Sequence, residues 1–291
     1  MRRRIFTGCL GIVLLLLLFA FAAVVFVYAQ AQRTPSGKAE YVALGSSFAA
    51  GAGLGSLQDS SPLLCARSSN GYPQQLAKMR KLSIVDMSCG GAVTKHLLTG
   101  GQFFQGPQIR VIGPETRLVT ITVGGNDVGY VGDTQMLAAR HSGTVPGWLA
   151  SRFWNGPSAD AERDYAGFER QLGQLLQTIH SRAPAATVVV AAYPAILPQS
   201  GSCNAIKLTD EEVSLMRGVG DRLAAATRAA AKAGGAILVD MNQLGAGHDA
   251  CSSSPWVKGA VALSEAPFHP TLEGARATAG EISKALDHQQ L

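Results

Sequence analysis

The chain has 291 residues and a formal net charge of +5, and 47% of its residues are hydrophobic while 15% are charged. Three of the positive charges belong to Arg2, Arg3 and Arg4, so the rest of the chain has a net charge of only +2. Because that remainder has no run of like charge and no basic helix face, the composition argues against a nucleic-acid partner. Its length suits one sizeable α/β domain.

The first 31 residues have the pattern of an export signal. The three arginines precede an uncharged apolar run, Cys9–Tyr28, and Ala29-Gln30-Ala31 follows as an A-x-A cleavage motif. At roughly 20 residues, the run is also long enough to span a bilayer as an uncleaved anchor. Both alternatives place the rest of the chain outside the cytoplasm, secreted or in the cell envelope, and the second provides a membrane tether through residues 9–28. We therefore divide the chain into a signal peptide or signal anchor at 1–31, a polar linker at 32–38 and one domain at 39–291.

Five short, mostly apolar runs are typical of parallel strands that are buried on both faces of a sheet. They are Glu40–Gly45, Ser83–Ser88, Leu118–Val123, Thr187–Ala192 and Ala236–Val239. Helical patterns lie near Tyr72–Arg80, Ala161–Arg182 and Glu211–Ala233, and a final helix is expected to begin at Pro270. This alternation predicts an α/β fold, a doubly wound three-layer αβα sandwich with a five-stranded parallel sheet.

Four cysteines follow the N-terminal segment, at Cys65, Cys89, Cys203 and Cys251. An even number of cysteines in an exported protein is typical of disulfides, and the absence of C-x-x-C spacing argues against a zinc site. Four cysteines allow three pairings, of which we predict the local one, Cys65–Cys89 and Cys203–Cys251. Because the histidines at 96, 141, 180 and 288 also lack metal-ligand spacing, we expect neither a metal nor a cofactor.

A serine, Ser47, follows the first predicted strand, at the edge where open α/β sheets place their chemistry. A serine in a turn is weak evidence alone, because turns are rich in serine for local hydrogen-bonding reasons. Two further signals follow in order along the chain. Gly124-Gly125-Asn126-Asp127 comes after the third strand, and Phe268-His269-Pro270 lies near the C-terminus.

These segments together offer a candidate for each role in ester cleavage. A serine nucleophile such as Ser47 needs a neutral imidazole beside it, and His269 at a predicted helix start would be held neutral by the positive end of the helix dipole. The oxyanion that forms needs hydrogen-bond donors, which Asn126 and a backbone N–H near Gly90-Gly91 can supply.

In this order and spacing the segments resemble those of the SGNH hydrolases, also called GDSL-type lipases and esterases. The resemblance runs from Tyr41 to Gly274 and implies a flavodoxin-like fold. It also implies that Ser47 is the nucleophile and that the oxyanion hole consists of the N–H groups of Ser47 and Gly91 and the amide of Asn126. The substrates that it implies are carboxylic esters, lipid-like or carbohydrate-linked, and we expect a monomer.

Two positions depart from the family pattern. Ser46 replaces the aspartate that usually precedes the nucleophile, and Ala266 replaces the acid three residues before His269. In the second departure, in the segment Gly247–Cys251 and in its cysteines, the chain is similar to exported actinobacterial-type esterases that use a backbone carbonyl instead. This similarity predicts that the Ala266 carbonyl orients His269, with the Glu265 carboxylate as the rival.

The sequence therefore predicts an exported serine esterase or lipase that works through a Ser47–His269 dyad and an acyl-enzyme. One alternative is an acyltransferase that uses the same acyl-enzyme, and another is a degenerate envelope-binding domain that kept only the fold. Two aromatic groups in long loops are open to two interpretations, because they either line an acyl pocket or cap the core. These groups are Phe103-Phe104 and the set Trp148, Phe153 and Trp154.

Overall fold

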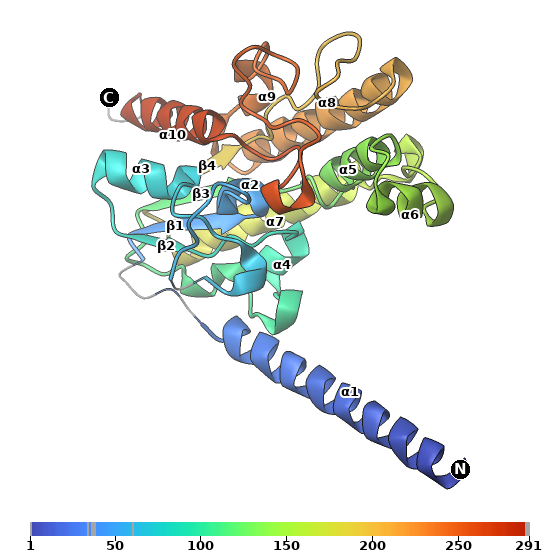
Figure 1. Ribbon diagram of the computed structural model, residues 1–291. Helices are drawn as coiled ribbons and strands as arrows, with labels where there is room; N and C mark the ends of the chain where they lie inside the picture. Colours follow the sequence, from blue (N-terminus) through green and yellow to red (C-terminus); the bar gives the residue numbers. More distant parts are fainter. Residues whose placement is uncertain (1, 34, 36–38, 60, 289–291) are drawn as a thin grey trace.

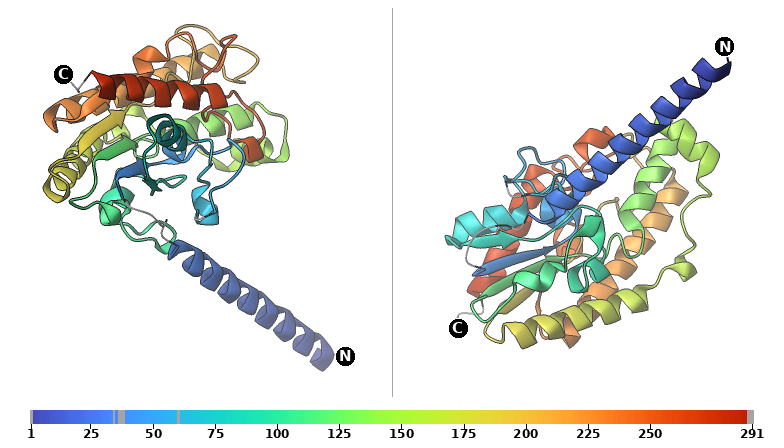
Figure 2. Two further views of the ribbon diagram at one scale, coloured as in Figure 1. Left: turned by 90° about the vertical axis from the view of Figure 1, so that its left-hand side faces the viewer. Right: turned by 90° about the horizontal axis from the view of Figure 1, so that it is seen from below.

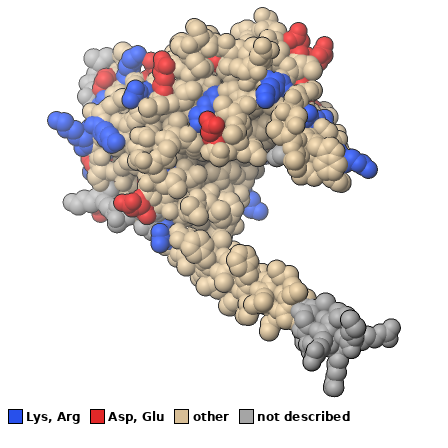
Figure 3. Space-filling model, in the orientation of Figure 1, with Lys and Arg blue, Asp and Glu red and all other residues tan. Residues whose placement is uncertain are grey.

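The structure is a computed structural model that describes residues 2–33, 35, 39–59 and 61–288. Its first helix, α1 (Arg2–Ala31), projects from the rest of the molecule (Figure 1). The segment Gly11–Ala31 is long and apolar enough to cross a membrane, and Figure 3 shows no charged side chain on the part of α1 that it describes. The predicted linker falls largely outside the described residues, because 34 and 36–38 are not among them.

The remainder is built on one sheet of five parallel strands in the order β2-β1-β3-β4-β5. Each predicted strand is present, within two residues at either end. All residues of β1 and of β3 are buried, which explains their unbroken apolar sequences. The strands are β1 (Tyr41–Gly45), β2 (Ile84–Asp86), β3 (Leu118–Thr122), β4 (Thr187–Ala191) and β5 (Ile237–Val239).

Helices cover both faces of the sheet and give the predicted three-layer α/β sandwich (Figures 1 and 2). One hydrophobic core lies between the sheet and α4, α5, α7 and α8, and a second lies between the opposite face and α3 and α10. The strand order is that of flavodoxin-like folds. The helices after α1 are α2 (Ser47–Ala50), α3 (Tyr72–Arg80), α4 (Thr94–Leu98), α5 (Tyr130–Arg140), α6 (Val145–Phe153), α7 (Tyr165–Arg182), α8 (Asp210–Ala233), α9 (Met241–Leu244) and α10 (Leu272–Asp287). Short 3-10 turns are η1 (Leu63–Cys65), η2 (Gln102–Phe104), η3 (Gln108–Val111), η4 (Asp160–Glu162) and η5 (Leu263–Glu265).

The ends of two helices show how local side chains set their limits. The Thr209 hydroxyl accepts from the N–H of Glu212, whose carboxylate accepts from the N–H of Thr209, and this capping box begins α8. The expectation that the last helix begins at Pro270 is wrong. The Thr271 hydroxyl accepts from the N–H of Gly274, 3.0 Å away, so Thr271 is the N-cap and α10 begins at Leu272.

Both disulfides are present with the predicted pairing, Cys65–Cys89 and Cys203–Cys251. The first joins η1 to the loop that follows β2, and Gly90-Gly91 is the next segment of that loop. The second joins the loop before α8 to the loop after α9. Covalent links of this kind restrict the long connections at one edge of the sheet.

Candidate active site

Ser47, in the turn after β1, and Asn126, in the turn after β3, both belong to the carboxyl edge of the sheet. These strands are neighbours in register, with Gly45 opposite Thr122, so they end at the same level. The chain passes from β1 to β2 on one side and then returns to β3 on the other, which makes this edge the topological switch point of the sheet. The fold therefore brings Ser47 and Asn126 to the crevice where open α/β sheets bind their ligands.

The turn before Ser47 is fixed by a close backbone approach and by a buried glutamine. Gly45 has a φ of +139°, and a Cβ there would lie 2.2 Å from the Thr122 carbonyl oxygen, so only glycine fits. The Gln108 side chain accepts from the N–H of Gly45 at 2.9 Å and donates to its carbonyl at 3.0 Å. Gln108 thus holds both backbone groups of the residue two places before Ser47.

Ser46, which stands where the family has aspartate, takes part in a neutral buried pair. It is fully buried, and its hydroxyl is hydrogen-bonded to the hydroxyl of Tyr193. Burial raises the pKa of Tyr193 well above its ordinary value, so both groups stay uncharged. A Cβ at Gly125 would lie 2.6 Å from the Tyr193 ring. The one tyrosine therefore packs against the turns that carry both Ser47 and Asn126.

Ser47 and His269 are joined by a hydrogen bond, although 222 residues separate them in sequence. The distance from the Ser47 Oγ to the His269 Nε2 is 2.7 Å, and the His269 Nδ1 lies 2.9 Å from the Pro267 carbonyl oxygen. A carbonyl only accepts, so Nδ1 carries the proton and donates it. Nε2 then has a free lone pair and accepts from the serine hydroxyl.

The prediction that the Ala266 carbonyl orients His269 is wrong, because the Pro267 carbonyl has that position. Phe268 has a left-handed backbone, with a φ of +58°. In this turn the Pro267 oxygen points toward the ring of His269. The Glu265 carboxylate does not take the role either. The Glu265 side chain is exposed, and its main-chain oxygen accepts from the Lys258 Nζ at 2.6 Å.

The imidazole of His269 is in an environment that favours its neutral form. Burial, the largest cause, lowers the pKa of His269, and the positive charge of Lys258 lowers it further, while the hydrogen bond to Pro267 raises it. The predicted cause, the dipole of a helix that starts at His269, does not apply, because α10 begins after the Thr271 N-cap. A neutral imidazole of this kind is suited to accept a proton from Ser47.

Asn126 and Gly91, the other two predicted oxyanion donors, lie in segments that are joined by a hydrogen bond. The Asn126 Nδ2 donates to the Ala92 carbonyl at 2.9 Å, which orients the amide and leaves its second N–H free of that bond. Gly91, directly before Ala92, is exposed and has a φ of +76°. The Gly90 carbonyl accepts from the Gln102 side chain at 2.7 Å, which holds the loop on its other side.

Asp127, the last residue of the Gly-Gly-Asn-Asp segment, has a structural contact. Its carboxylate accepts from the N–H of Thr94, at 2.9 and 3.2 Å, at the start of α4. Over the described ranges of the chain, no three His, Cys, Asp or Glu side chains are grouped as ligands of a metal ion.

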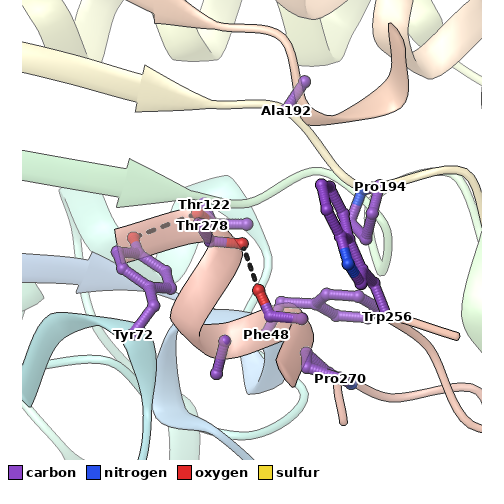
Figure 4. Close-up of a pocket in the computed structure, with 10 residues that line it drawn as sticks. Phe48, Tyr72, Thr122, Ala192, Pro194, Trp256, Pro270 and Thr278 are labelled. Carbon is purple, nitrogen blue, oxygen red and sulfur yellow. Dashed lines mark hydrogen bonds between the residues drawn. The ribbon is translucent and has the colours of Figure 1, made fainter. Parts of the chain in front are cut away.

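Two cavities are lined by residues next to Ser47 and His269 in the sequence, although neither residue lines them. The smaller one, of about 10 Å³, lies between the sheet and α10, and Phe48, Trp256 and Pro270 are among its walls (Figure 4). It admits at most about one water molecule. The larger one, of about 510 Å³, begins at Pro267 and Phe268, next to His269. Its walls are mostly apolar and come from α5, the α5–α6 turn and residues 260–264, with Lys207 as the one charged residue among the described residues that line it.

Neither of the two aromatic groups lines this larger cavity. Phe104 of η2 packs against Tyr28 of α1, with 6.3 Å between the ring centres. Trp148 and Phe153 belong to α6, a helix in a stretch that we expected to be a loop, and both are exposed. The side chain of Trp154 lies under the guanidinium of Arg140.

A parallel sheet in this strand order, with a serine after β1, an asparagine after β3 and a histidine bonded to the serine, is the architecture of an α/β ester hydrolase. Comparison with known families gives the same class. The model of the GDSL-like lipase/acylhydrolase family matches residues 43–277. The chain belongs to this family and is an ester hydrolase.

Individual relatives come from Streptomyces. A lipase of Streptomyces rimosus is 33% identical over 238 residues, which cover 81% of this chain and 82% of the relative. Lipase 2 of Streptomyces coelicolor is 33% identical and covers 88% of each chain. Among solved structures, the extracellular lipase of Streptomyces rimosus superposes with a TM-score of 0.68 at 31% identity, covering 84% of this chain and 98% of that one. Phospholipase A1 of Streptomyces albidoflavus has a TM-score of 0.67 at 25% identity, covering 87% and 99%.

Proposed function

We propose that the chain is an exported lipase or esterase in which Ser47 and His269 form a catalytic dyad. The observation that carries this proposal is the hydrogen bond of 2.7 Å between the Ser47 Oγ and the His269 Nε2, with Nδ1 held by Pro267. Export is supported by the apolar segment Gly11–Ala31 and by the two disulfides. Residues 39–291 then act outside the cytoplasm, either released or tethered through residues 9–28.

In the first half of the reaction, the Ser47 Oγ attacks the ester carbonyl carbon and its proton passes to the His269 Nε2. The imidazolium keeps its Nδ1–H on the Pro267 carbonyl. The N–H groups of Ser47 and Gly91 and the amide of Asn126 donate to the oxyanion. His269 then returns the proton to the leaving alcohol as the carbon–oxygen bond breaks, and Ser47 remains acylated.

In the second half, a water molecule gives a proton to His269 and attacks the acyl carbon. The bond between the Ser47 Oγ and the carbonyl carbon breaks, the proton returns to Oγ, and a carboxylic acid leaves. An acceptor alcohol in place of water would make an ester by the same steps, so product analysis separates a hydrolase from an acyltransferase. Membership of an enzyme family and the assembled dyad argue against a purely binding role.

The larger cavity supports lipid-like esters as substrates. Its volume of about 510 Å³ and its mostly apolar walls next to Phe268 suit an acyl chain better than a sugar. The names of two relatives, a lipase and a phospholipase A1, agree with this substrate class. We therefore propose that the acyl part of the ester lies in this cavity.

The acyl preference can be measured with a series of 4-nitrophenyl esters from acetyl to palmitoyl. Each methylene that enters the cavity contributes roughly 0.8 kcal/mol. We therefore expect kcat/KM to rise from acetyl to medium chains by at least about a hundredfold, which corresponds to some 2.7 kcal/mol. A preference for acetyl over all longer chains would contradict the proposed cavity, and no turnover of any ester would contradict the proposed function.

The pH dependence tests the neutral base. Because the pKa of His269 is lowered, activity should rise with pH through a value below about 6.5 and level off near neutrality. Lys258→Gln removes a charge that lowers this pKa but keeps a donor for the Gly53 and Glu265 carbonyls. The acid limb of kcat/KM should therefore move to higher pH. An unchanged limb, or a shift to lower pH, would show that Lys258 does not act on the base.

A further inference from the structure

The carbonyl that orients His269 has a second partner on a distant helix. The Gln135 Nε2 of α5 donates to the Pro267 oxygen at 2.9 Å, and the same oxygen accepts from the His269 Nδ1 at 2.9 Å. A carbonyl oxygen has two lone pairs, and these two donors use both. Figure 1 shows η5, which leads into this segment, beside α5.

The segment from Glu265 to His269 depends on such contacts for its shape. Ala266 and Phe268 both have left-handed backbones, with φ values of +55° and +58°, a conformation that residues with a Cβ rarely adopt. Local preference therefore does not direct the Pro267 carbonyl toward the ring. Lys258 holds one end of the segment through the Glu265 carbonyl, and Gln135 holds the Pro267 carbonyl itself.

We propose that Gln135 is a positioning residue for the reaction at Ser47. By fixing the Pro267 carbonyl, it fixes the tautomer and the direction of the His269 ring. A carboxylate performs this task in a conventional triad. Here a main-chain oxygen performs it, and Gln135 supplies the rigidity that an unsupported carbonyl lacks. This inference rests on the proposed function of the dyad.

The alternative is that Gln135 only contacts the acyl chain of the substrate. Its side chain also lines the cavity of about 510 Å³. A residue that only contacts the acyl chain changes KM, whereas one that positions the base changes kcat and the pH profile. The split between the two constants therefore separates the roles.

The test is Gln135→Met in the full chain, which keeps the side-chain volume and the helix propensity but removes the donor. We expect kcat to fall about tenfold to a hundredfold, the size of effect that a misdirected catalytic group produces. KM should stay nearly constant. The acid limb should move to lower pH, because the hydrogen bond to Pro267 raises the pKa of His269 and is weakened in the variant. The charged residues beside the segment, Lys258 and Glu265, and Lys207 in the cavity wall, are unchanged in the variant.

The matched control is Gln177→Met, the same substitution at an exposed position of α7, which should leave kcat and the pH profile unchanged. If Gln135→Met does not fold, Gln135→Asn keeps the amide but is one methylene too short to reach Pro267, and the same kinetic losses are expected. Nitrogen-15 chemical shifts of the His269 ring give a direct reading. The wild-type ring should be protonated at Nδ1 at neutral pH, and the variant ring should show a mixture of tautomers.

Wild-type kcat in the folded variant, a change confined to KM, or unchanged ring shifts would each overturn the role of Gln135. A wild-type chain without ester hydrolysis would instead refute the proposed function, so the two failures are distinguishable.

Discussion

Ser47→Ala is expected to lower kcat by on the order of 10⁴ or more, because the acyl-enzyme cannot form without the hydroxyl. The side chain of Ser47 is nearly buried and bonded to His269, so removing one oxygen should leave the fold intact. Steady-state hydrolysis of a soluble ester measures the loss, and thermal unfolding checks the fold. A variant that kept a tenth of the wild-type turnover would exclude Ser47 as the nucleophile.

If Ser47 and His269 form the proposed dyad, the loss should be shared with the base, because the two residues would act as a unit. His269→Ala should lower kcat nearly as much as Ser47→Ala, and the double variant should be no worse than either single one. Independent, additive losses in the double variant would mean that Ser47 and His269 serve separate steps.

Asn126→Ala is expected to lower kcat roughly 10²–10³-fold with little change in KM, because the amide stabilises charge that develops only in the transition state. The Asn126 side chain also bonds to Ala92, so a structural role has to be separated from the catalytic one. Asp127→Asn is the matched control, since it keeps an oxygen acceptor for the N–H of Thr94 in the same turn. We expect the control to retain nearly full kcat. Equal losses in both variants would assign Asn126 to the structure of the turn.

The residues that the sequence predicts best are those at the ends of strands. Ser47 and Asn126 lie two and four residues after the ends of β1 and β3, and the carboxyl ends of neighbouring parallel strands lie at one edge of a sheet. The position of such residues in space follows from the strand pattern alone. Local motifs also predict the start of α8, because both partners of its capping box lie within four residues.

The support of the site could not be predicted in this way. His269 is oriented by the Pro267 carbonyl and not by that of Ala266 because the backbone of Phe268 is left-handed. A phenylalanine in the sequence does not indicate that conformation. Gln108 and Gln135 contact Gly45 and Pro267 from 63 and 132 residues away. A single glutamine on a helix or turn has no pattern that indicates such a partner.

Of the five helices in the described part of the chain that the sequence did not predict, α2, α4, α5, α6 and α9, two were missed for identifiable physical reasons. In α6 a proline and a glycine occupy the first turn, which reads as a loop, and Trp148 and Phe153 are exposed, so no apolar stripe indicates a buried face. In α5 the helix follows directly from the turn that carries Asn126 and Gly129, whose glycines suggest a longer connection.

Labelling with a fluorophosphonate tests the dyad most directly, because this reagent reacts with a serine only where a neighbouring base activates it and an oxyanion hole receives the phosphoryl oxygen. The full chain should gain one adduct, peptide mass spectrometry should place it on Ser47, and Ser47→Ala should gain none. His269→Ala should react far more slowly. An unlabelled wild-type chain, or an adduct on a serine other than Ser47, would contradict the assignment of the active site.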